Sequence, residues 1–120
     1  MSRLVYAHFA DDVWSETLLD PGANAAPAPA ITIKQDDGGI FIAYGASRID
    51  RRVLDYDLRL AARRAFAADW ELRVIDEVGN VAEKVDIAAS INIATSAGWL
   101  EAVVILYSDK IGPSRIAYGP

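Results

Sequence analysis

Few side chains of this sequence can take part in covalent chemistry. It has no cysteine, and its one histidine is His8. A thiolate nucleophile, a disulfide and a site built from several histidines or cysteines are therefore excluded, and a Ser-His-Asp triad would have to use His8. Asp36-Asp37 lies beside Gly38-Gly39, which could hint at calcium, but the spacing matches no EF-hand loop and favours a plain turn. The sequence predicts a protein that is not an enzyme and that needs no cofactor or metal.

Three tryptophans are candidates for non-covalent ligand binding. Trp14 and Trp70 occupy equivalent places in a repeat described below, and Trp99 follows Gly98 at an expected hairpin tip. Aromatic rings that remain accessible can anchor ligands or partners. The alternative is that Trp14 and Trp70 fill the space between sheets and that Trp99 covers a gap between sheets or subunits.

Arginines form a second candidate site. Six of the nine lie within 17 residues, namely Arg48, Arg51, Arg52, Arg59, Arg63 and Arg64. Such a cluster could bind carboxylate or phosphate groups through paired hydrogen bonds, and Arg48 is our candidate contact. Interleaved aspartates at 50, 55 and 57 favour instead a solvated surface of mixed charge.

Composition narrows the class of protein. The 120 residues suffice for a single domain over 1–120, and 52% of them are hydrophobic, which is typical of a folded chain. The net charge of −5 argues against duplex nucleic acid as a partner. No apolar run approaches the ~20 residues of a membrane span, and the sequence start has no apolar signal-peptide region. We expect no membrane partner and, by default, a cytoplasmic protein.

Short β-type runs separated by turn residues predict strands. The expected strands cover 4–9, 13–19, 31–33, 40–44, 53–61, 70–78, 87–95, 102–107 and 115–118. The run 40–44 is continuously apolar, which indicates burial on both faces. The segment 23–30 is expected to be an extended connection, because Pro27 and Pro29 keep it out of a helix.

Residues 51–70 allow two interpretations. Their Ala, Leu and Arg content suits a helix with Leu54, Leu58 and Phe66 on one face, which would make the fold α+β. Alternatively, apolar residues alternate with charged ones from Leu54 to Leu60, which is the period of a strand. The repeat favours a strand followed by a longer hairpin.

An internal repeat organises the chain. Trp14 lies six residues before Asp20, and Trp70 lies six before Asp76. Further matches join Ile31-x-Ile33 to Ile91-x-Ile93, Gly38 to Gly98, and Tyr44 to Tyr107, and three aliphatic-x-Tyr segments recur as Leu4-Val5-Tyr6, Leu54-Asp55-Tyr56 and Ile116-Ala117-Tyr118. Two units of four strands are predicted, over about 4–53 and 54–118. They are circularly permuted, with one redundant strand at the end.

These segments resemble the blade repeat of bacterial β-propellers. The residues that carry the resemblance are Ile42-Ala43-Tyr44, Leu4-Val5-Tyr6-Ala7, and the Trp strands 14–20 and 70–76. The departures are a longer hairpin before Trp70, three extra residues between Gly98 and Tyr107, and the Ala/Pro-rich link at 23–30. The resemblance implies an all-β fold with two four-stranded, propeller-like blades per chain.

Two blades leave apolar faces uncovered, so the resemblance also implies that the ring is completed by a homo-oligomer, with a trimer favoured. Small lectins of this kind bind glycans between blades. The expected function is a non-enzymatic, lectin-like binding module that uses Trp99, Trp14, Trp70 and Arg48. The alternatives are a structural or protein-interaction domain, or a fragment of a larger propeller. A sialidase-type hydrolase ranks below these.

Overall fold

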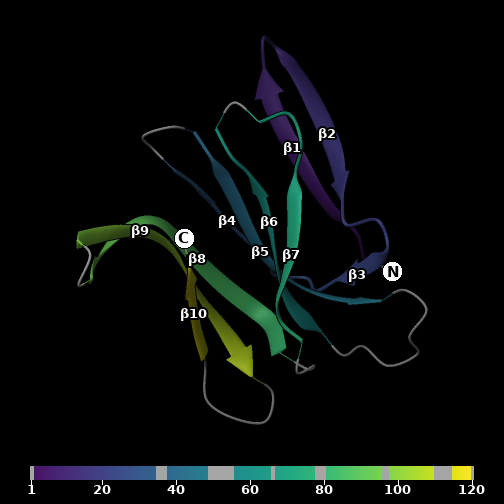
Figure 1. The fold of residues 1–120 in the computed structure, drawn as a ribbon. Coiled ribbons are helices and arrows are strands. Elements are labelled where there is room, and N and C mark those ends of the chain that lie inside the picture. Colours follow the sequence, from purple (N-terminus) through teal and green to yellow (C-terminus); the bar gives the residue numbers. More distant parts are fainter. Residues whose placement is uncertain are drawn as a thin grey trace.

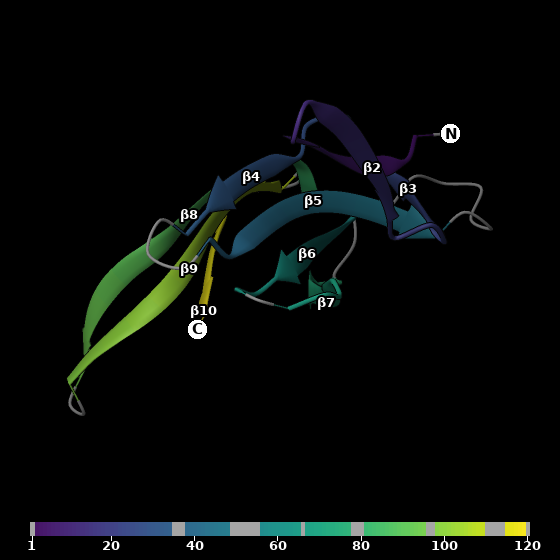
Figure 2. The same cartoon turned by 90° about the horizontal axis from the view of Figure 1, so that it is seen from above.

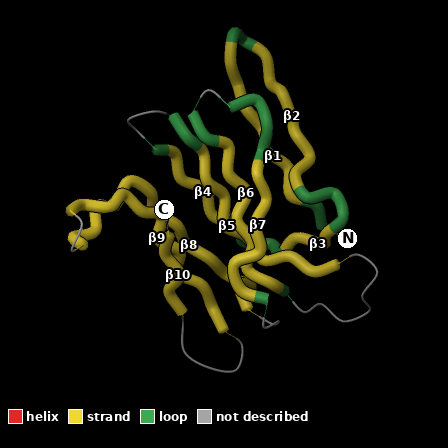
Figure 3. The backbone as a smooth tube through the Cα atoms, viewed as in Figure 1, coloured by secondary structure: helices red, strands yellow, loops and turns green. Residues whose placement is uncertain are grey.

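The structure is a computed structural model in which residues 2–34, 38–48, 56–65, 67–77, 81–95, 98–109 and 115–119 are described. Every regular element in these ranges is a strand, so the protein is all-β (Figure 3). The strands are β1 (Leu4–Ala10), β2 (Val13–Leu19), β3 (Ala23–Ala25), β4 (Ala30–Ile33), β5 (Ile40–Arg48), β6 (Asp57–Arg63), β7 (Glu71–Asp76), β8 (Val81–Thr95), β9 (Gly98–Asp109) and β10 (Arg115–Gly119).

The strands form three antiparallel sheets. Strands β1 and β2 make a two-stranded hairpin, called the N-terminal hairpin below. The central sheet has the order β4-β5-β6-β7, with β3 pairing further along the same edge of β5 as β4 does. The third sheet has the order β8-β9-β10. Each sheet is thus built mainly from neighbours in the chain.

The molecule is flat, with extents of 44 × 43 × 18 Å, and the central sheet lies between the other two sheets (Figures 1 and 2). The N-terminal hairpin packs on one face of the central sheet, and β8 and β9 pack on the other. Among the described sheets, the central sheet is therefore the only one with another sheet packed on each of its faces.

Strand β5 shows why the sequence folds this way. Successive side chains of a strand point to opposite faces. Ile40, Ile42 and Tyr44 belong to the core shared with the N-terminal hairpin, whereas Phe41 and Ala43 belong to the core shared with β8 and β9. The predicted burial of 40–44 on both faces is confirmed.

Turn chemistry fixes the N-terminal hairpin. Asp11 and Asp12 both have positive φ, 53° and 63°. This backbone matches the twist of the strands it joins, and Asp tolerates it better than most side chains. It aligns Ala10 with Val13 and, at the far end, Leu4 with Leu19. The predicted turn at Asp11-Asp12 and the predicted strand 13–19 are confirmed.

The helical alternative for 51–70 is wrong where that segment is described. Residues 57–63 form β6, which pairs with β5 on one side and with β7 on the other. Leu58 and Ala62 face β8 and β9, whereas Ala61 faces the N-terminal hairpin. Strand pairing on both sides overrides the helical propensity of Ala and Leu. Residues 51–55 and 66 lie outside the described residues, and the observed strand starts four residues later than predicted.

Smaller differences from the predictions concern strand bounds. The segment 23–30 is extended as expected, but Ala23–Ala25 also pairs with β5. Strand β8 begins at Val81 rather than at 87, with irregular pairing between Val81 and Val85. Gly98 is already within β9, opposite Thr95. The expected turn residues 36–37, 79–80, 97 and 112–113 lie outside the described residues.

Strand register corrects one part of the predicted repeat. Tyr44 lies opposite Arg59, and Tyr107 lies opposite Arg115. The third strand of each unit therefore aligns on Arg3, Arg59 and Arg115. These arginines are equally spaced in the sequence, 56 residues apart (59 − 3 = 115 − 59 = 56). This spacing, called the repeat period below, also separates Trp14 from Trp70 and Asp20 from Asp76. Matching Tyr56 with Tyr6 was wrong, since Tyr56 precedes β6.

Candidate functional site

The four predicted ligand contacts lie on different elements. Trp70 immediately precedes β7 and is half-buried against the N-terminal hairpin. Trp14 is on the outer face of that hairpin, 67% exposed, with Phe9 as its ring neighbour at 5.3 Å. Arg48 ends β5 opposite Ala23, and Trp99 is in β9 opposite Ala94. The side chains of Arg48 and Trp99 lie outside the described residues.

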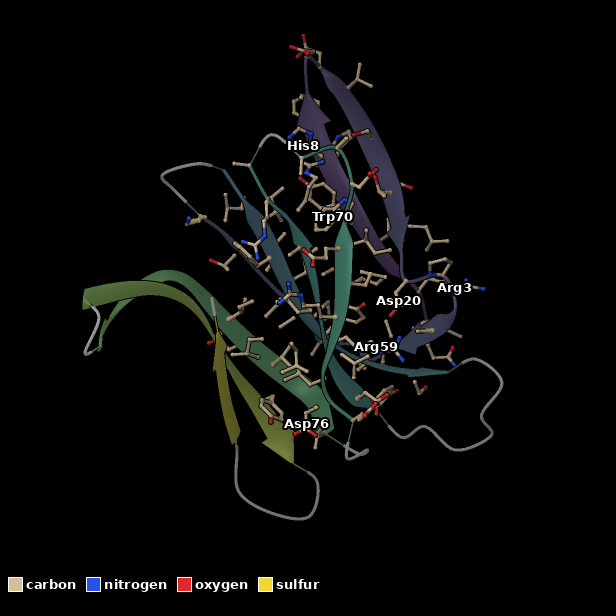
Figure 4. All side chains as sticks on the ribbon, in the orientation of Figure 1. Arg3, His8, Asp20, Arg59, Trp70 and Asp76 are labelled. Carbon is tan, nitrogen blue, oxygen red and sulfur yellow. The ribbon has the colours of Figure 1, made fainter. Side chains whose placement is uncertain are left out.

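Trp70 belongs to an aromatic cluster that sequence reasoning missed. The cluster consists of Tyr6, His8, Arg63 and Trp70, and it lies where β1 meets the ends of β6 and β7. The Tyr6 and Trp70 rings meet edge to face with centroids 5.1 Å apart. His8 stacks on Tyr6 at 6.1 Å and 14° between ring planes. Figure 4 shows His8 and Trp70 together at this junction.

A cation completes the aromatic cluster. The Arg63 guanidinium lies over both rings, 5.7 Å from the Tyr6 centroid and 5.5 Å from the Trp70 centroid. Such cation–π contacts typically contribute ~0.5–1 kcal/mol at accessible sites. Tyr6, Arg63 and Trp70 are each half-buried, and His8 is exposed. The cluster therefore combines two half-buried rings, a guanidinium and an imidazole.

Local structure places each member of the cluster. Tyr6 and His8 are two residues apart in β1 and so share one face of it. Arg63 is the last residue of β6, and Trp70 closes the connection into β7. The alternation of β1 could have indicated that Tyr6 and His8 are neighbours. Their meeting with Arg63 and Trp70 depends on packing between sheets, for which the sequence carries no short-range signal.

A polar contact, called the Asp20 latch below, joins the same two sheets at the far end of the N-terminal hairpin. Asp20 Oδ2 accepts hydrogen bonds from the Tyr44 hydroxyl at 2.9 Å and from Arg59 Nη1 at 2.7 Å. Asp57 Oδ2 lies 3.7 Å from Arg59 Nη2. Asp20 and Arg59 lie beside each other in Figure 4, with side chains 13% and 16% exposed. Their mutual attraction is consequently less screened than that of a surface pair.

Burial keeps the Tyr44 hydroxyl of the Asp20 latch protonated. Tyr44 is fully buried, and burial first, then its hydrogen bond to the Asp20 carboxylate and the charge of that carboxylate, raises the pKa of Tyr44 far above the ordinary value near 10. Arg59 opposes this shift. Nε of Arg59 is buried without a hydrogen-bond partner in the described part of the chain. Tyr44 therefore acts as a neutral donor to a carboxylate, in a contact suited to holding sheets together.

A second contact of the same kind joins the central sheet to the third sheet. The Tyr107 hydroxyl donates to Asp76 Oδ2 at 2.8 Å. Asp76 ends β7 as Asp20 follows β2, and Tyr107 in β9 corresponds to Tyr44 in β5. The aspartates and tyrosines that the sequence matched thus make the same bond in both units.

An apolar groove of about 260 Å³ opens between the N-terminal hairpin and the central sheet, on the β4 side. Tyr6 forms a wall that it shares with the aromatic cluster. The groove is lined by Leu4, Val5, Tyr6, Ala7, Pro29, Ala30, Ile31 and Ile42.

Within the described ranges, no group of three or more His, Asp or Glu residues is placed to hold a metal ion. The described chain also has no helix of the length and apolarity needed to cross a membrane. No protein family, curated protein or solved structure matches this chain.

Proposed function

We propose that this chain is a non-enzymatic, carbohydrate-binding module whose ligand site is the aromatic cluster of Tyr6, His8, Arg63 and Trp70. The observation that carries the proposal is the arrangement of two half-buried rings and a guanidinium at an accessible junction between sheets. A pyranose ring would place its C–H face on Trp70. Its hydroxyl or carboxylate oxygens would accept hydrogen bonds from Arg63.

Comparison within the repeat supports this choice of site. The Asp–Tyr contact occurs in both units and has the character of a scaffold. The aromatic cluster follows the repeat only in part: Trp14 and Tyr118 stand at positions equivalent to Trp70 and Tyr6, but Ala62 stands one repeat period after Tyr6, and Ala7 stands one repeat period before Arg63. A combination of side chains that the scaffold does not require at the equivalent position is a reasonable place for ligand recognition.

The sheets are proposed to be propeller-like blades. In support, the central sheet is an antiparallel series of four strands adjacent in the chain, and neighbouring sheets stack face to face. The incomplete outer sheets support assembly of several copies into a ring, as propellers need four or more blades to close.

Glycan-array binding followed by titration calorimetry tests the ligand. Trp70→Ala and Arg63→Ala should each weaken binding of a positive glycan at least tenfold, since they remove the stacking surface and the charged donor. The matched controls are Trp14→Ala, at the equivalent repeat position, and Arg64→Ala, which is exposed and adjacent to Arg63. Silence of the array, or equal losses in the controls, would contradict the proposal.

A second candidate function is protein interaction, which the outer face of the N-terminal hairpin favours. Cross-strand pairs place Val5 beside Leu18, and Phe9 beside Trp14, on that face, and all four are exposed. Neighbouring apolar residues of this size on a surface are typical of an interface. A chain that binds a protein, and whose Trp14→Ala variant loses it while the glycan array stays silent, would favour this function.

A further inference from the structure

Strands β1 and β10 are equivalent to one another. Arg3 immediately precedes β1, and Arg115, the first residue of β10, stands two repeat periods later. At the same offset, Leu4-Val5-Tyr6 corresponds to Ile116-Ala117-Tyr118. The chain therefore carries two versions of a strand that pairs with the tyrosine strand of a unit.

Of β1 and β10, only β10 pairs with a tyrosine strand in the described chain. Strand β10 pairs with β9, and the third equivalent, β6, pairs with β5. Strand β1 pairs with β2 alone among the described strands, so one of its edges is open. An open edge presents backbone donors and acceptors that favour the addition of a strand.

Uncovered apolar residues surround the open edge of β1. On the hairpin side of the central sheet, Ile31 and Ile33 of β4 are 55% and 57% exposed, and the apolar groove runs between β4 and β1. On the opposite side, β8 and β9 cover β5, with Ile105 and Tyr107 in the same core cluster as Phe41. A pair of strands like β8 and β9, placed beside β1, would fill the groove and cover Ile31 and Ile33.

We propose that this pair of strands comes from a second copy of the chain: the N-terminal hairpin of one copy pairs through β1 with β9 of the other and displaces β10 from that edge. The proposal rests on the ring assembly of the proposed function and names the strands that make it. The shared sheet would have the order β8-β9-β1-β2, with the first two strands from one copy and the last two from the other. It would reproduce the strand order of the central sheet.

The repeat fixes the register of this contact. Arg115 lies opposite Tyr107, and Gly119 lies opposite Val103, in the present chain. A shift back by two repeat periods places Arg3 opposite the second copy's Tyr107, and Ala7 opposite the second copy's Val103. Arg3 would then meet the Tyr107–Asp76 contact of that copy as Arg59 meets Tyr44 and Asp20. Its present hydrogen bond to the Pro21 carbonyl oxygen is exposed and is easily exchanged.

The contact joins different surfaces of the two copies, so it propagates head to tail and ends in a ring where the rotation closes. Each copy would contribute one complete central sheet and two halves of shared sheets. Tyr6 is the residue that the groove and the aromatic cluster share; His8, Arg63 and Trp70 do not line the groove.

Disulfide trapping tests the register, since the sequence has no cysteine to interfere. Copies that carry Ala7→Cys are mixed with copies that carry Val103→Cys and are oxidised under native conditions. We expect a cross-linked pair in the mixture and much less in either variant alone. The control mixes Ala7→Cys with Leu106→Cys, which is three residues out of register. Equal cross-linking in the control, or an Ala7→Cys homodimer as the main product, would overturn the proposal.

Competition from β10 gives a second, independent measurement. Ala117→Pro weakens the pairing of β10 with β9, because proline cannot donate to a strand ladder. We expect self-association, measured by light scattering after size exclusion, to tighten about tenfold. Unchanged or weaker association would overturn the proposal, even if glycans still bind through Trp70. Conversely, a silent glycan array together with the expected cross-link would contradict the proposed glycan binding and still support the proposed assembly.

Discussion

The Asp20 latch and the aromatic cluster join the same two sheets by different chemistry. The latch uses a buried carboxylate between a hydroxyl and a guanidinium, and its Asp–Tyr bond recurs between Asp76 and Tyr107. The cluster uses half-buried rings beneath a guanidinium, and in the neighbouring unit Ala62 and Ala7 stand where Tyr6 and Arg63 would be. The comparison separates a contact that recurs along the chain from one that the described residues make once.

The largest expected effect on stability is at Asp20. Asp20→Asn keeps the side-chain size and tolerates the positive φ of 46° at this residue, but leaves the Arg59 charge partly buried without its close partner. We expect a loss of roughly 2 kcal/mol in the free energy of unfolding, below the full cost of breaking a buried pair because some solvent and Asp57 remain. Urea unfolding measures it, with the exposed Glu16→Gln as control; a loss no larger than the control's would show that the latch is not structural.

The next effect is the loss of one buried hydrogen bond. Tyr44→Phe and Tyr107→Phe should each cost about 1.5 kcal/mol in unfolding free energy, because each removes a hydroxyl that donates to a carboxylate. Similar values would confirm that the two contacts play the same role. Very different values would break the structural equivalence of the two units.

The raised pKa of Tyr44 predicts a pH dependence. Below about pH 10 the phenol is neutral in both folded and unfolded chains, so its contribution to stability is complete. Above pH 10 the unfolded chain ionises Tyr44 while the folded chain does not, so stability falls. The advantage of the unaltered protein over Tyr44→Phe should therefore shrink as the pH rises through the ordinary tyrosine pKa. A constant difference would mean that Tyr44 ionises normally in the folded state.

A smaller effect is expected within the aromatic cluster. A double-mutant cycle of Arg63→Ala and Trp70→Ala should give a coupling of roughly 0.5 kcal/mol in unfolding free energy, the usual size of an accessible cation–π contact. A coupling as large as the cost of breaking the Asp20 latch would make the cluster a structural element and weaken its claim to be a ligand site.

The smallest expected effect is at Trp14, measured on the monomer. Trp14→Ser should change the unfolding free energy by less than about 0.5 kcal/mol, because the ring is mostly exposed. The same change at Trp70 would cost several times more, since Trp70 packs between sheets. Equal costs would contradict the difference in environment between these two equivalent positions.

The sequence predicted much of the fold because strand signals are local. Alternation, turn residues and an apolar run were enough to place β2 and the two-sided burial of β5, and the spacing of Asp20 and Asp76 identified partners that make equivalent bonds. The repeat went out of register at Tyr56, where an aliphatic-x-Tyr segment resembled a third strand more closely than the actual one at Arg59 does.

The candidate site was harder to predict because it forms between sheets. Only Trp70 of the four predicted contacts lies in the aromatic cluster, and Tyr6, His8 and Arg63 were not singled out as contacts. Tyr6 and Trp70 are far apart in the chain and meet through the stacking of two sheets. The angle of that stacking depends on strand twist, which no short motif encodes.

The sequence separation of the latch contacts has a consequence for how the chain acquires its structure. The hydrogen bonds that fasten one sheet to the next span 24, 39 and 31 residues, and none of them joins the first sheet to the last. Each sheet needs only the preceding one as a template, so loop closure costs nearly the same at every step. We expect stepwise folding that can follow synthesis from the ribosome, with the N-terminal hairpin formed before β9 has emerged.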